Sequence, residues 1–304
     1  TTTAIPDPLV LPPLLPDASA RTQKVVSWNV ASLNASFKKG LMRYLTAEMA
    51  DIVCLQETKL RADPAPDSDL GTALGAHWPH QAWSHSAKPG YSGTAILSRT
   101  APLAVETGLG SHAAETEGRV VACRFPDFVL VNVYVPNASE GLKRTGFKQA
   151  FLVALRAHVA DLVQRWDPVG QRLLLVGDVN TCLYPTDLAR PKTNIKTSGF
   201  SPDERRDYHD FLMGYPDAPS SESADRRSFE PLVDLYRRQH GPQAGGYTYY
   251  SYRFQARAKG LGWRLDAFLA SRALADTLFK TIAVREDAYG ASDHVPLIAL
   301  LERT

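Results

Sequence analysis

Short runs of apolar and β-branched residues recur along the chain and predict strands. These runs span residues 25–29, 52–57, 93–98, 119–125, 128–134, 172–178, 247–252, 264–270, 280–285 and 296–302. Many of them are apolar throughout instead of alternating with polar residues, which is typical of sheets that are covered on both faces. The pattern therefore predicts strands that lie in the interior of the protein.

Helical spacing of apolar residues appears between some of these runs. Residues 38–49 place Leu41, Tyr44 and Leu45 on one face, and residues 146–165 repeat that spacing. Ser201 to Glu204 form a capping box with proline at the first helical position, which predicts a helix that ends near residue 214. Residues 61–90 and 181–200 are predicted to be long loops. Together the elements predict an α/β fold with two mixed sheets and helices outside.

Composition narrows the class of protein without naming its chemistry. The chain has 304 residues, of which 44% are hydrophobic and 22% charged, as in soluble globular proteins. Its net charge is only +2, so affinity for a polyanion would have to come from the placement of charges. Residues 1–22 are proline-rich and predicted to form an extended lead, and residues 23–304 a single catalytic domain.

The number of cysteines and the length of the apolar runs indicate in which cellular environment the protein folds. Three cysteines (Cys54, Cys123 and Cys182) cannot form a disulfide framework. Two of them lie in apolar strand-like runs and are expected to be core thiols in a reducing, intracellular environment. No apolar run approaches the length of a membrane span, and residues 1–20 lack the order of a signal peptide. We expect no membrane association.

Polar side chains stand at the ends of several predicted strands. Asn29, Glu57, Tyr134 and Asp178 each end a run, Asp266 lies early in another, and His294 precedes the last. Asn180 follows Asp178 by two residues and should point the same way if the strand continues. Carboxyl ends of strands are where α/β sheets commonly hold their active sites.

These groups suit the hydrolysis of a phosphodiester. Oxygen ligands from Glu57, Asp293 and Asn29 suit Mg²⁺, with Mn²⁺ as a substitute, and the common CxxC pattern of zinc sites is absent. Asp178 could deprotonate a water that Asn180 holds. A pair of His294 with Asp266 could donate to a phosphoryl oxygen.

The motifs WNV, LQETK, YSG, YVPN, GDVN, GWRLD and SDHVP occur in this order between residues 28 and 296. In this order and spacing the chain resembles the exonuclease III family of abasic-site DNA endonucleases. SDHVP by itself marks only the wider endonuclease/exonuclease/phosphatase superfamily. The resemblance implies a four-layer α/β sandwich of the DNase I type, with two mixed β-sheets packed face to face.

The resemblance also assigns roles to residues. It implies that Glu57, Asp293 and Asn29 bind Mg²⁺, that Asp178 and Asn180 prepare the water, and that His294, oriented by Asp266, contacts the phosphate. Tyr134 and Asn137 would support His294 in this contact. The abasic sugar would enter a pocket of Tyr249, Trp263 and Leu265. Residues expected to contact DNA are Tyr91, Lys59, Arg144, Asn194 and Arg253.

Five positions depart from the family pattern. Ala31 stands where an Asp or Asn is usual, which leaves one versus two metals open, and Ser139-Glu140 stand where an arginine is expected. Arg253 replaces an apolar wedge, and Tyr249 replaces a phenylalanine.

The resemblance therefore implies a Mg²⁺-dependent enzyme of base excision repair that cuts DNA 5′ to an abasic site and leaves a 3′-hydroxyl. Side activities as 3′-phosphodiesterase or 3′–5′ exonuclease come with the family. We expect a monomer whose partner is abasic double-stranded DNA, in the nucleus, with the mitochondrion as the alternative. Two other functions stay open: an inositol-phosphate-type phosphatase of the same superfamily, and a DNA-binding relative that has lost catalysis.

Overall fold

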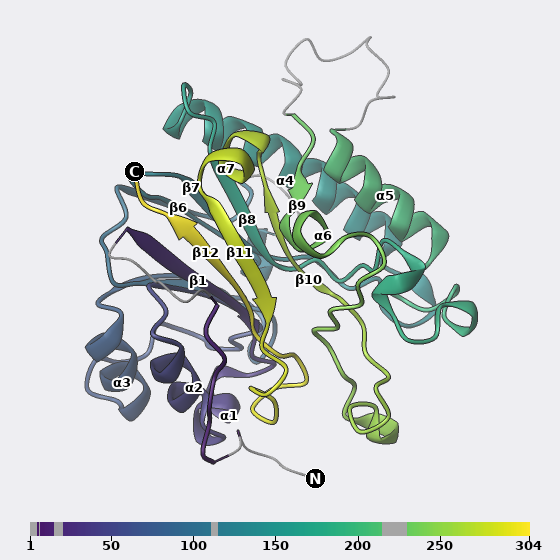
Figure 1. Ribbon diagram of the computed structural model, residues 1–304, viewed down its shortest axis with the longest axis horizontal. Coiled ribbons are helices and arrows are strands. Elements are labelled where there is room, and N and C mark those ends of the chain that lie inside the picture. The colour runs from purple at the N-terminus through teal and green to yellow at the C-terminus, as the bar shows by residue number, and fades with distance from the viewer. Residues whose placement is uncertain (1–4, 6, 15–20, 111–114, 215–229) are drawn as a thin grey trace.

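Two six-stranded sheets form the centre of the protein (Figure 1). The computed structural model describes residues 5, 7–14, 21–110, 115–214 and 230–304. The first sheet has the order β11 (Phe279–Val284), β12 (Leu297–Glu302), β1 (Thr22–Asn29), β2 (Ile52–Gln56), β4 (Thr94–Ser98) and β3 (His80–Ser84). The second has the order β5 (Ala104–Thr107), β6 (Val120–Arg124), β7 (Val129–Tyr134), β8 (Leu173–Asp178), β10 (Asp266–Ala270) and β9 (Val233–Asp234).

Both sheets are mixed. β1 pairs with β2 and β7 pairs with β8 in parallel, and the remaining neighbours are antiparallel. Helices α1 (Leu33–Lys38), α2 (Leu41–Glu48) and α3 (Asp69–His77) lie beside the first sheet, whereas α4 (Thr145–Trp166) and α5 (Pro202–Met213) cover the second (Figure 1). Two short helices, α6 (Leu235–His240) and α7 (Arg272–Thr277), flank β9, β10 and β11.

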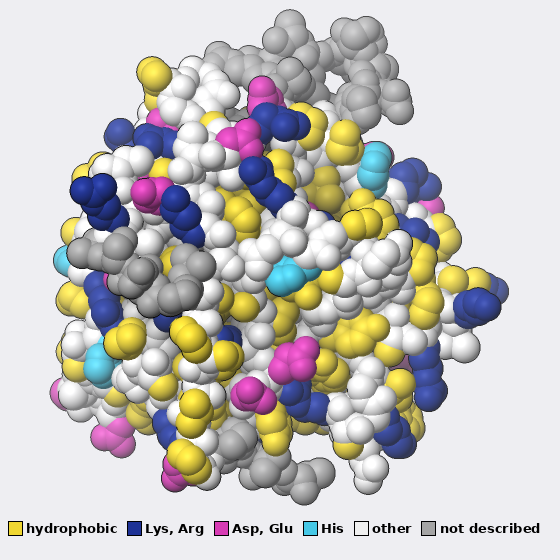
Figure 2. Space-filling model, viewed as in Figure 1, with side chains coloured by type: hydrophobic (Ala, Val, Ile, Leu, Met, Phe, Trp, Pro, Cys, Tyr) yellow, Lys and Arg dark blue, Asp and Glu magenta, His cyan; other side chains and the backbone are white. Residues whose placement is uncertain are grey.

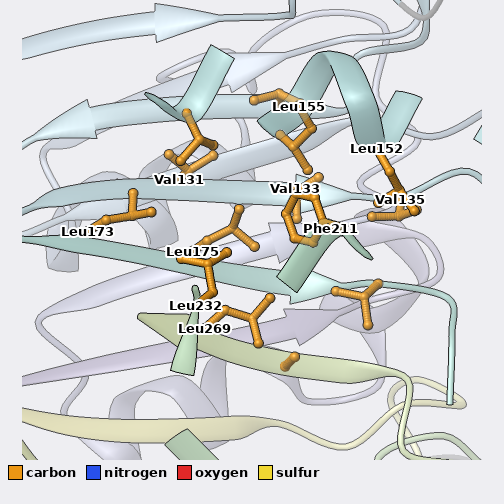
Figure 3. Packing of buried hydrophobic residues seen from close by; sticks show 14 of the residues in the cluster. Val131, Val133, Val135, Leu152, Leu155, Leu173, Leu175, Phe211, Leu232 and Leu269 are labelled. Carbon is orange, nitrogen blue, oxygen red and sulfur yellow. The ribbon is translucent and has the colours of Figure 1, made fainter. Parts of the chain in front are cut away.

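Three apolar clusters hold these layers together. One lies between the sheets and contains Ile52 and Cys54 from β2 with Leu174 from β8. Neighbouring residues of β2, such as Val53, point the other way, into a cluster with α1, α2 and α3. The third cluster joins the outer face of the second sheet to α4 and α5 and is shown in Figure 3. Strands that are apolar throughout are thus explained by burial on both faces, and the four-layer arrangement is confirmed.

The expected elements differ from the structure in several places. Residues 61–90, predicted to be a loop, contain α3 and β3. The helix predicted over 38–49 is α2, which begins at Leu41 because Gly40, with φ 98°, separates it from α1. Residues 247–252 form no strand; Tyr249 makes isolated bridges to Trp263 and His294. The strands β5 and β9 were not predicted. Residues 181–200 form a loop with two short 3₁₀ turns, as expected.

The helix at Ser201 begins as predicted. The Ser201 hydroxyl accepts from the Glu204 amide, and the Glu204 carboxylate accepts from the Ser201 amide. Gly214 ends the helix with φ 90°. Within the described part of residues 1–22, Ile5 is buried against the helical side of the first sheet, and Pro12 accepts a hydrogen bond from Arg285.

All three cysteines are free and buried, including the one for which a core position was not predicted. Among the described residues, no helix combines the length and the apolar character that crossing a bilayer requires. On the face shown in Figure 2, Lys and Arg side chains are interspersed with acidic and apolar ones.

Candidate active site

Strand directions bring the polar residues of both sheets to one edge. Asn29 ends β1 and Glu57 follows β2, and these strands are parallel neighbours. Tyr134 and Asp178 end β7 and β8, the parallel pair of the other sheet, and are partners in register. Since carboxyl ends of parallel strands lie side by side, each sheet presents two of these residues at the same edge.

Antiparallel strands bring two further groups to that edge by their amino ends. Asp266 begins β10 and lies opposite Asp178 in the register of β8 and β10. His294 lies just before β12, which is antiparallel to β1. Sequence reasoning placed these side chains near strand ends, and the pairing explains why opposite ends of different strands meet.

His294 and Asp266 form a buried pair. Nδ1 of His294 lies 2.8 Å from Oδ2 of Asp266, and Nε2 lies 3.9 Å from Oδ2 of Asp178. Burial opposes the charged imidazolium, but the carboxylates of Asp266 and Asp178 outweigh it and raise the pKa of His294 to about 10. At neutral pH His294 is therefore a cation that can donate from Nε2.

Asp178 is a buried carboxylate beside another carboxylate. Burial and the charge of Asp266 raise its pKa to about 7, against the charge of His294 and hydrogen bonds from Asn180 and Asn29. The Asn29 amide donates to Asp178 at 2.9 Å, and the Asn180 backbone N–H donates at 2.8 Å. A carboxyl that titrates near neutrality is suited to accept a proton from water.

Glu57 stands at the other side of Asn29. The Asn29 amide nitrogen donates to Glu57 Oε1 at 3.0 Å, and Lys59 Nζ lies 2.8 Å from Oε2. Burial opposes ionisation of Glu57, but Lys59 and the Asn29 bond prevail and lower its pKa. Glu57 is thus an anion: one of its oxygens accepts a hydrogen bond from the Asn29 amide, and the other forms an ion pair with the Lys59 ammonium.

Tyr134 belongs to the same group of side chains. Its hydroxyl is hydrogen-bonded to Glu57. Burial and the charges of Glu57 and Asp178 raise its pKa well above the usual value, so the phenol stays protonated. The Arg119 guanidinium lies 4.7 Å from the centre of its ring and donates to its backbone carbonyl.

The side-chain amides of Asn180 and Asn137 are hydrogen-bonded to each other. Asn137 Nδ2 donates to Asn180 Oδ1 at 3.1 Å, and Asn180 Nδ2 donates to the Val135 carbonyl. Asn137 also accepts from Ser198 at 2.9 Å, which ties it to the 181–200 loop. Asn180 holds φ 50°, a left-handed conformation that asparagine tolerates better than most residues.

Positive backbone angles gather at this edge. The φ angles of Ala31, Glu57, Lys59 and Ser92 lie between 49° and 55°, in the same left-handed region. Gly93 holds φ 91°, and a Cβ on it would lie 2.3 Å from the Thr58 hydroxyl. Because such conformations cost free energy and cluster where function demands them, they mark this edge as a functional site.

The donor set fits a hard divalent cation in its chemistry. Glu57, Asp293 and Asp178 supply carboxylate oxygens, and Asn29 adds an amide oxygen that here accepts from the Ala31 N–H at 3.0 Å. A different trio, Asp178, Asp266 and His294, places one ligand atom each within 4.8 Å of the others. The assignment of Glu57, Asp293 and Asn29 as the ligands stays a prediction.

The predicted pocket residues pack together. They belong to one apolar cluster, which contains Tyr249, Trp263 and Leu265. The cluster also contains three residues that the sequence did not predict: Cys182, Leu188 and Phe200. The Tyr249 ring centre lies 5.0 Å from that of His294. The Tyr249 hydroxyl is hydrogen-bonded to Ser251. The cluster therefore adjoins the imidazole.

The residues expected to contact DNA fall into two groups. The Tyr91 hydroxyl accepts from Arg144 at 2.8 Å and from Arg119 at 2.9 Å, and Glu117 pairs with both arginines. This group adjoins Tyr134 through Arg119. Sequence reasoning did not single out Arg119, since nothing in the sequence indicated that it would be buried.

Asn194 and Arg253 lie on exposed loops. Asn194 donates to the Arg190 carbonyl at 2.7 Å and accepts from Thr197, so its side chain braces its own loop. Arg253 lies between Tyr252 and Phe254, whose side chains are 64% and 81% exposed. Phe254 is an apolar group beside Arg253 that sequence reasoning did not single out.

Comparison with known proteins places these observations in a family. A model of the endonuclease/exonuclease/phosphatase family matches residues 26–294. The chain is 38% identical over 286 residues to the DNA repair nuclease APEX1 of Danio rerio, covering 94% of this chain and 84% of that protein. It is 34% identical over 275 residues to an exodeoxyribonuclease of Bacillus subtilis, covering 90% and 97% of the two chains.

Solved structures agree in fold. The AP endonuclease LMAP of Leishmania major superposes with a TM-score of 0.76 at 28% identity, covering 94% of this chain and 89% of that one. The 3′–5′ exonuclease NExo of Neisseria meningitidis gives 0.74 at 28% identity, with 92% of this chain and all of that chain covered.

Proposed function

The chain belongs to the endonuclease/exonuclease/phosphatase family, and within it we propose that this protein is a DNA repair nuclease that incises DNA at abasic sites. The observation that carries the proposal is the meeting of Glu57, Asp178 and the His294–Asp266 pair at one edge of both sheets. The adjoining apolar cluster of Tyr249, Trp263 and Leu265 suits a sugar without a base. Relatives of similar sequence are named as nucleases of this kind.

The proposed substrate is a phosphodiester in double-stranded DNA, cut 5′ to the abasic residue to leave a 3′-hydroxyl. A divalent cation, Mg²⁺ in our proposal, would be held by Glu57, Asp293 and Asn29 and would supply neutralisation of phosphate charge. Asp178 accepts the proton of a water that Asn180 and Asn137 orient. The His294 cation donates to a phosphate oxygen as charge develops on it, and the Tyr134 hydroxyl donates to another after exchanging its bond to Glu57 for the phosphate.

Recognition of DNA is proposed to use phosphate contacts from Lys59, Arg144 and Arg253. The related NExo structures are described as a 3′–5′ exonuclease and as a 3′ phosphatase bound to a DNA hairpin. We therefore include 3′-end hydrolysis as a side activity of the same residues. Repair of this kind would place the protein with nuclear or mitochondrial DNA.

Incision of a duplex that carries a tetrahydrofuran residue tests the proposal. With Mg²⁺ the protein should cut 5′ to that residue, and EDTA should stop the reaction. Asp178→Asn keeps the shape of the side chain but removes the base, so the rate should fall roughly 10²–10⁴-fold. Asp161→Asn, on the exposed side of α4, should leave the rate unchanged.

Three results would contradict the proposal. Unchanged incision by Asp178→Asn would remove the assigned base. Hydrolysis of inositol phosphates in place of abasic DNA would assign the phosphatase function, and tight DNA binding with no cutting in Mg²⁺ or Mn²⁺ would assign a binding protein.

A further inference from the structure

A lysine lies buried beneath the loop that carries Asn180. Lys148 is in the first turn of α4 and is only 2% exposed. Its ammonium donates to the Asn180 backbone carbonyl at 2.6 Å and to Glu204 Oε1 at 2.8 Å. Since a buried ammonium is costly unless it is paired, both bonds are needed to keep it there.

Glu204, the partner of Lys148, also binds Gly199, at the far end of the segment that begins with Asn180. Its two carboxylate oxygens accept from the Gly199 amide at 3.0 and 2.9 Å, and one of them also accepts from the Ser201 hydroxyl at 2.8 Å. The Gly199 carbonyl in turn accepts from the Cys182 amide at 2.7 Å. One ion pair therefore joins α4, α5 and both ends of the 180–199 segment.

Gly199 lies against the apolar cluster. A Cβ built on it would be 3.4 Å from the Asn180 carbonyl oxygen, 3.6 Å from the Trp263 ring and 3.8 Å from Leu265. The ion pair thus holds together a residue beside Asp178 and a residue that touches the proposed pocket wall.

Asn180 depends on this support because its backbone is strained. Its φ of 50° is held by bonds at each of its polar groups: the N–H to Asp178, the side chain to Val135, Asp178 and Asn137, and the carbonyl to Lys148. Only the last of these partners comes from a helix on the outer side of the second sheet. It is charge-assisted, as are the bonds of the Asn180 N–H and side chain to the Asp178 carboxylate, and such bonds are about twice as strong as neutral ones.

We propose that Lys148 and Glu204 are a positioning pair for the reaction, which holds Asn180 in its left-handed conformation so that its side chain orients the attacking water. The proposal rests on the function proposed above and adds two residues that touch neither substrate nor metal. Loss of the ammonium frees the Asn180 carbonyl, and misplacement of the amide by even 1 Å can cost roughly a hundredfold in rate.

The test compares Lys148→Met with Arg156→Met. Both residues are buried cations on α4 that donate to backbone carbonyls, and Arg156 bonds Phe211 and Glu230 instead of the Asn180 loop. In Lys148→Met we expect kcat for abasic incision to fall roughly ten- to a hundredfold with KM changed less than about threefold. Arg156→Met should lose stability but keep kcat.

A double variant separates positioning from folding. Lys148→Met leaves the Glu204 charge buried without its partner, which destabilises the fold. Lys148→Met/Glu204→Gln removes both charges, so its unfolding temperature should return toward that of the parent protein. Its kcat should stay low, because methionine supplies no donor to the Asn180 carbonyl. Recovery of kcat together with stability would overturn the proposal.

A readout without catalysis keeps this proposal distinct from the proposed function. In amide NMR spectra of the metal-free protein, Lys148→Met should shift the signals of Asn180, Thr181 and Gly199, and Arg156→Met should leave them in place. Unshifted signals would overturn the positioning role. If the parent protein failed to cut abasic DNA but these signals shifted, the function would be wrong and the positioning of Asn180 would stand.

Discussion

At the scale of single residues, the active-site side chains were predictable but their bonds were not. Motif order identified Asp178, His294 and Glu57 because acids and imidazoles at strand ends are unusual enough to stand out. The direction in which Asn29 presents its amide was not predictable, because it depends on the positions of Glu57 and Asp178 from two different sheets.

Buried charges in helices were the hardest residues to identify. Lys148 falls on the same face of α4 as Phe151, Leu152 and Leu155, and these four residues are all buried. A lysine in an apolar stripe was the one signal in the sequence for such a role. Its partner Glu204 was predicted as a capping residue, and the capping box explains its bonds with the Ser201 backbone and hydroxyl but not those to Lys148 and Gly199.

The His294–Asp266 pair leads to a prediction on titration. In the metal-free protein, NMR titration should show the His294 imidazole deprotonating near pH 10, because Asp266 and Asp178 stabilise the cation. Asp266→Asn should lower that pKa by at least about one unit. A His294 signal that titrates identically in both proteins would contradict the pairing.

The same pKa shift implies a direction for stability. His294 binds its proton more tightly in the folded chain than in the unfolded chain, whose value is near 6.5. The contribution of the pair to the free energy of unfolding is therefore complete below about pH 6.5 and is lost as the pH rises toward 10.

At the scale of elements, strands buried on both faces were easily predicted and half-exposed ones were not. The runs that form β2, β7 and β8 are mostly apolar and almost entirely buried, whereas β5 is an edge strand whose residues alternate between half-buried and exposed. The helix α3 was missed because Gly71 and Gly75 interrupt its apolar spacing. Gly71 is required there, since a Cβ would lie 1.9 Å from the Ala65 carbonyl oxygen.

The contact of β7 with β8 makes a prediction about Gly177. This residue has φ 134°, and a Cβ on it would lie 2.0 Å from the Val133 carbonyl oxygen. Gly177→Ala should therefore lower the free energy of unfolding by roughly 2–4 kcal/mol and displace Asp178. Gly75→Ala, in the interior of α3 with open space around its Cβ, should instead raise it by roughly 0.5–1 kcal/mol. Urea unfolding of both variants checks this, and equal effects would refute the steric argument.

At the scale of the whole molecule, the number of sheets was predicted but the pairing within them was not. Strand order depends on contacts between distant segments, such as β12 with β1 and β10 with β8. No local pattern in either strand specifies its partner. Motif resemblance supplied the four layers instead, since it transfers an entire arrangement at once.

The modest net charge makes a prediction about DNA binding. The logarithm of the association constant for an abasic duplex should fall linearly with the logarithm of the salt concentration. The slope should be about −0.9 for each phosphate that the protein contacts. Arg253→Ala should reduce the magnitude of that slope by about 0.9 if Arg253 contacts a phosphate. Lys280→Ala serves as the control, because Lys280 pairs with Glu302 on strands at the far edge of the first sheet. Titrations by fluorescence anisotropy at several salt concentrations measure both slopes.

The chain enters the first sheet, leaves it after β4 to build the whole second sheet, and returns with β11 and β12. Because β12 pairs with β1 and His294 directly precedes it, the ribosome delivers the imidazole long after Glu57 and Asp178. A nascent chain that has emerged only as far as β10 lacks Asp293 and His294, so the site proposed for hydrolysis is still incomplete. The order of synthesis thus withholds hydrolytic competence until translation of the domain is almost over.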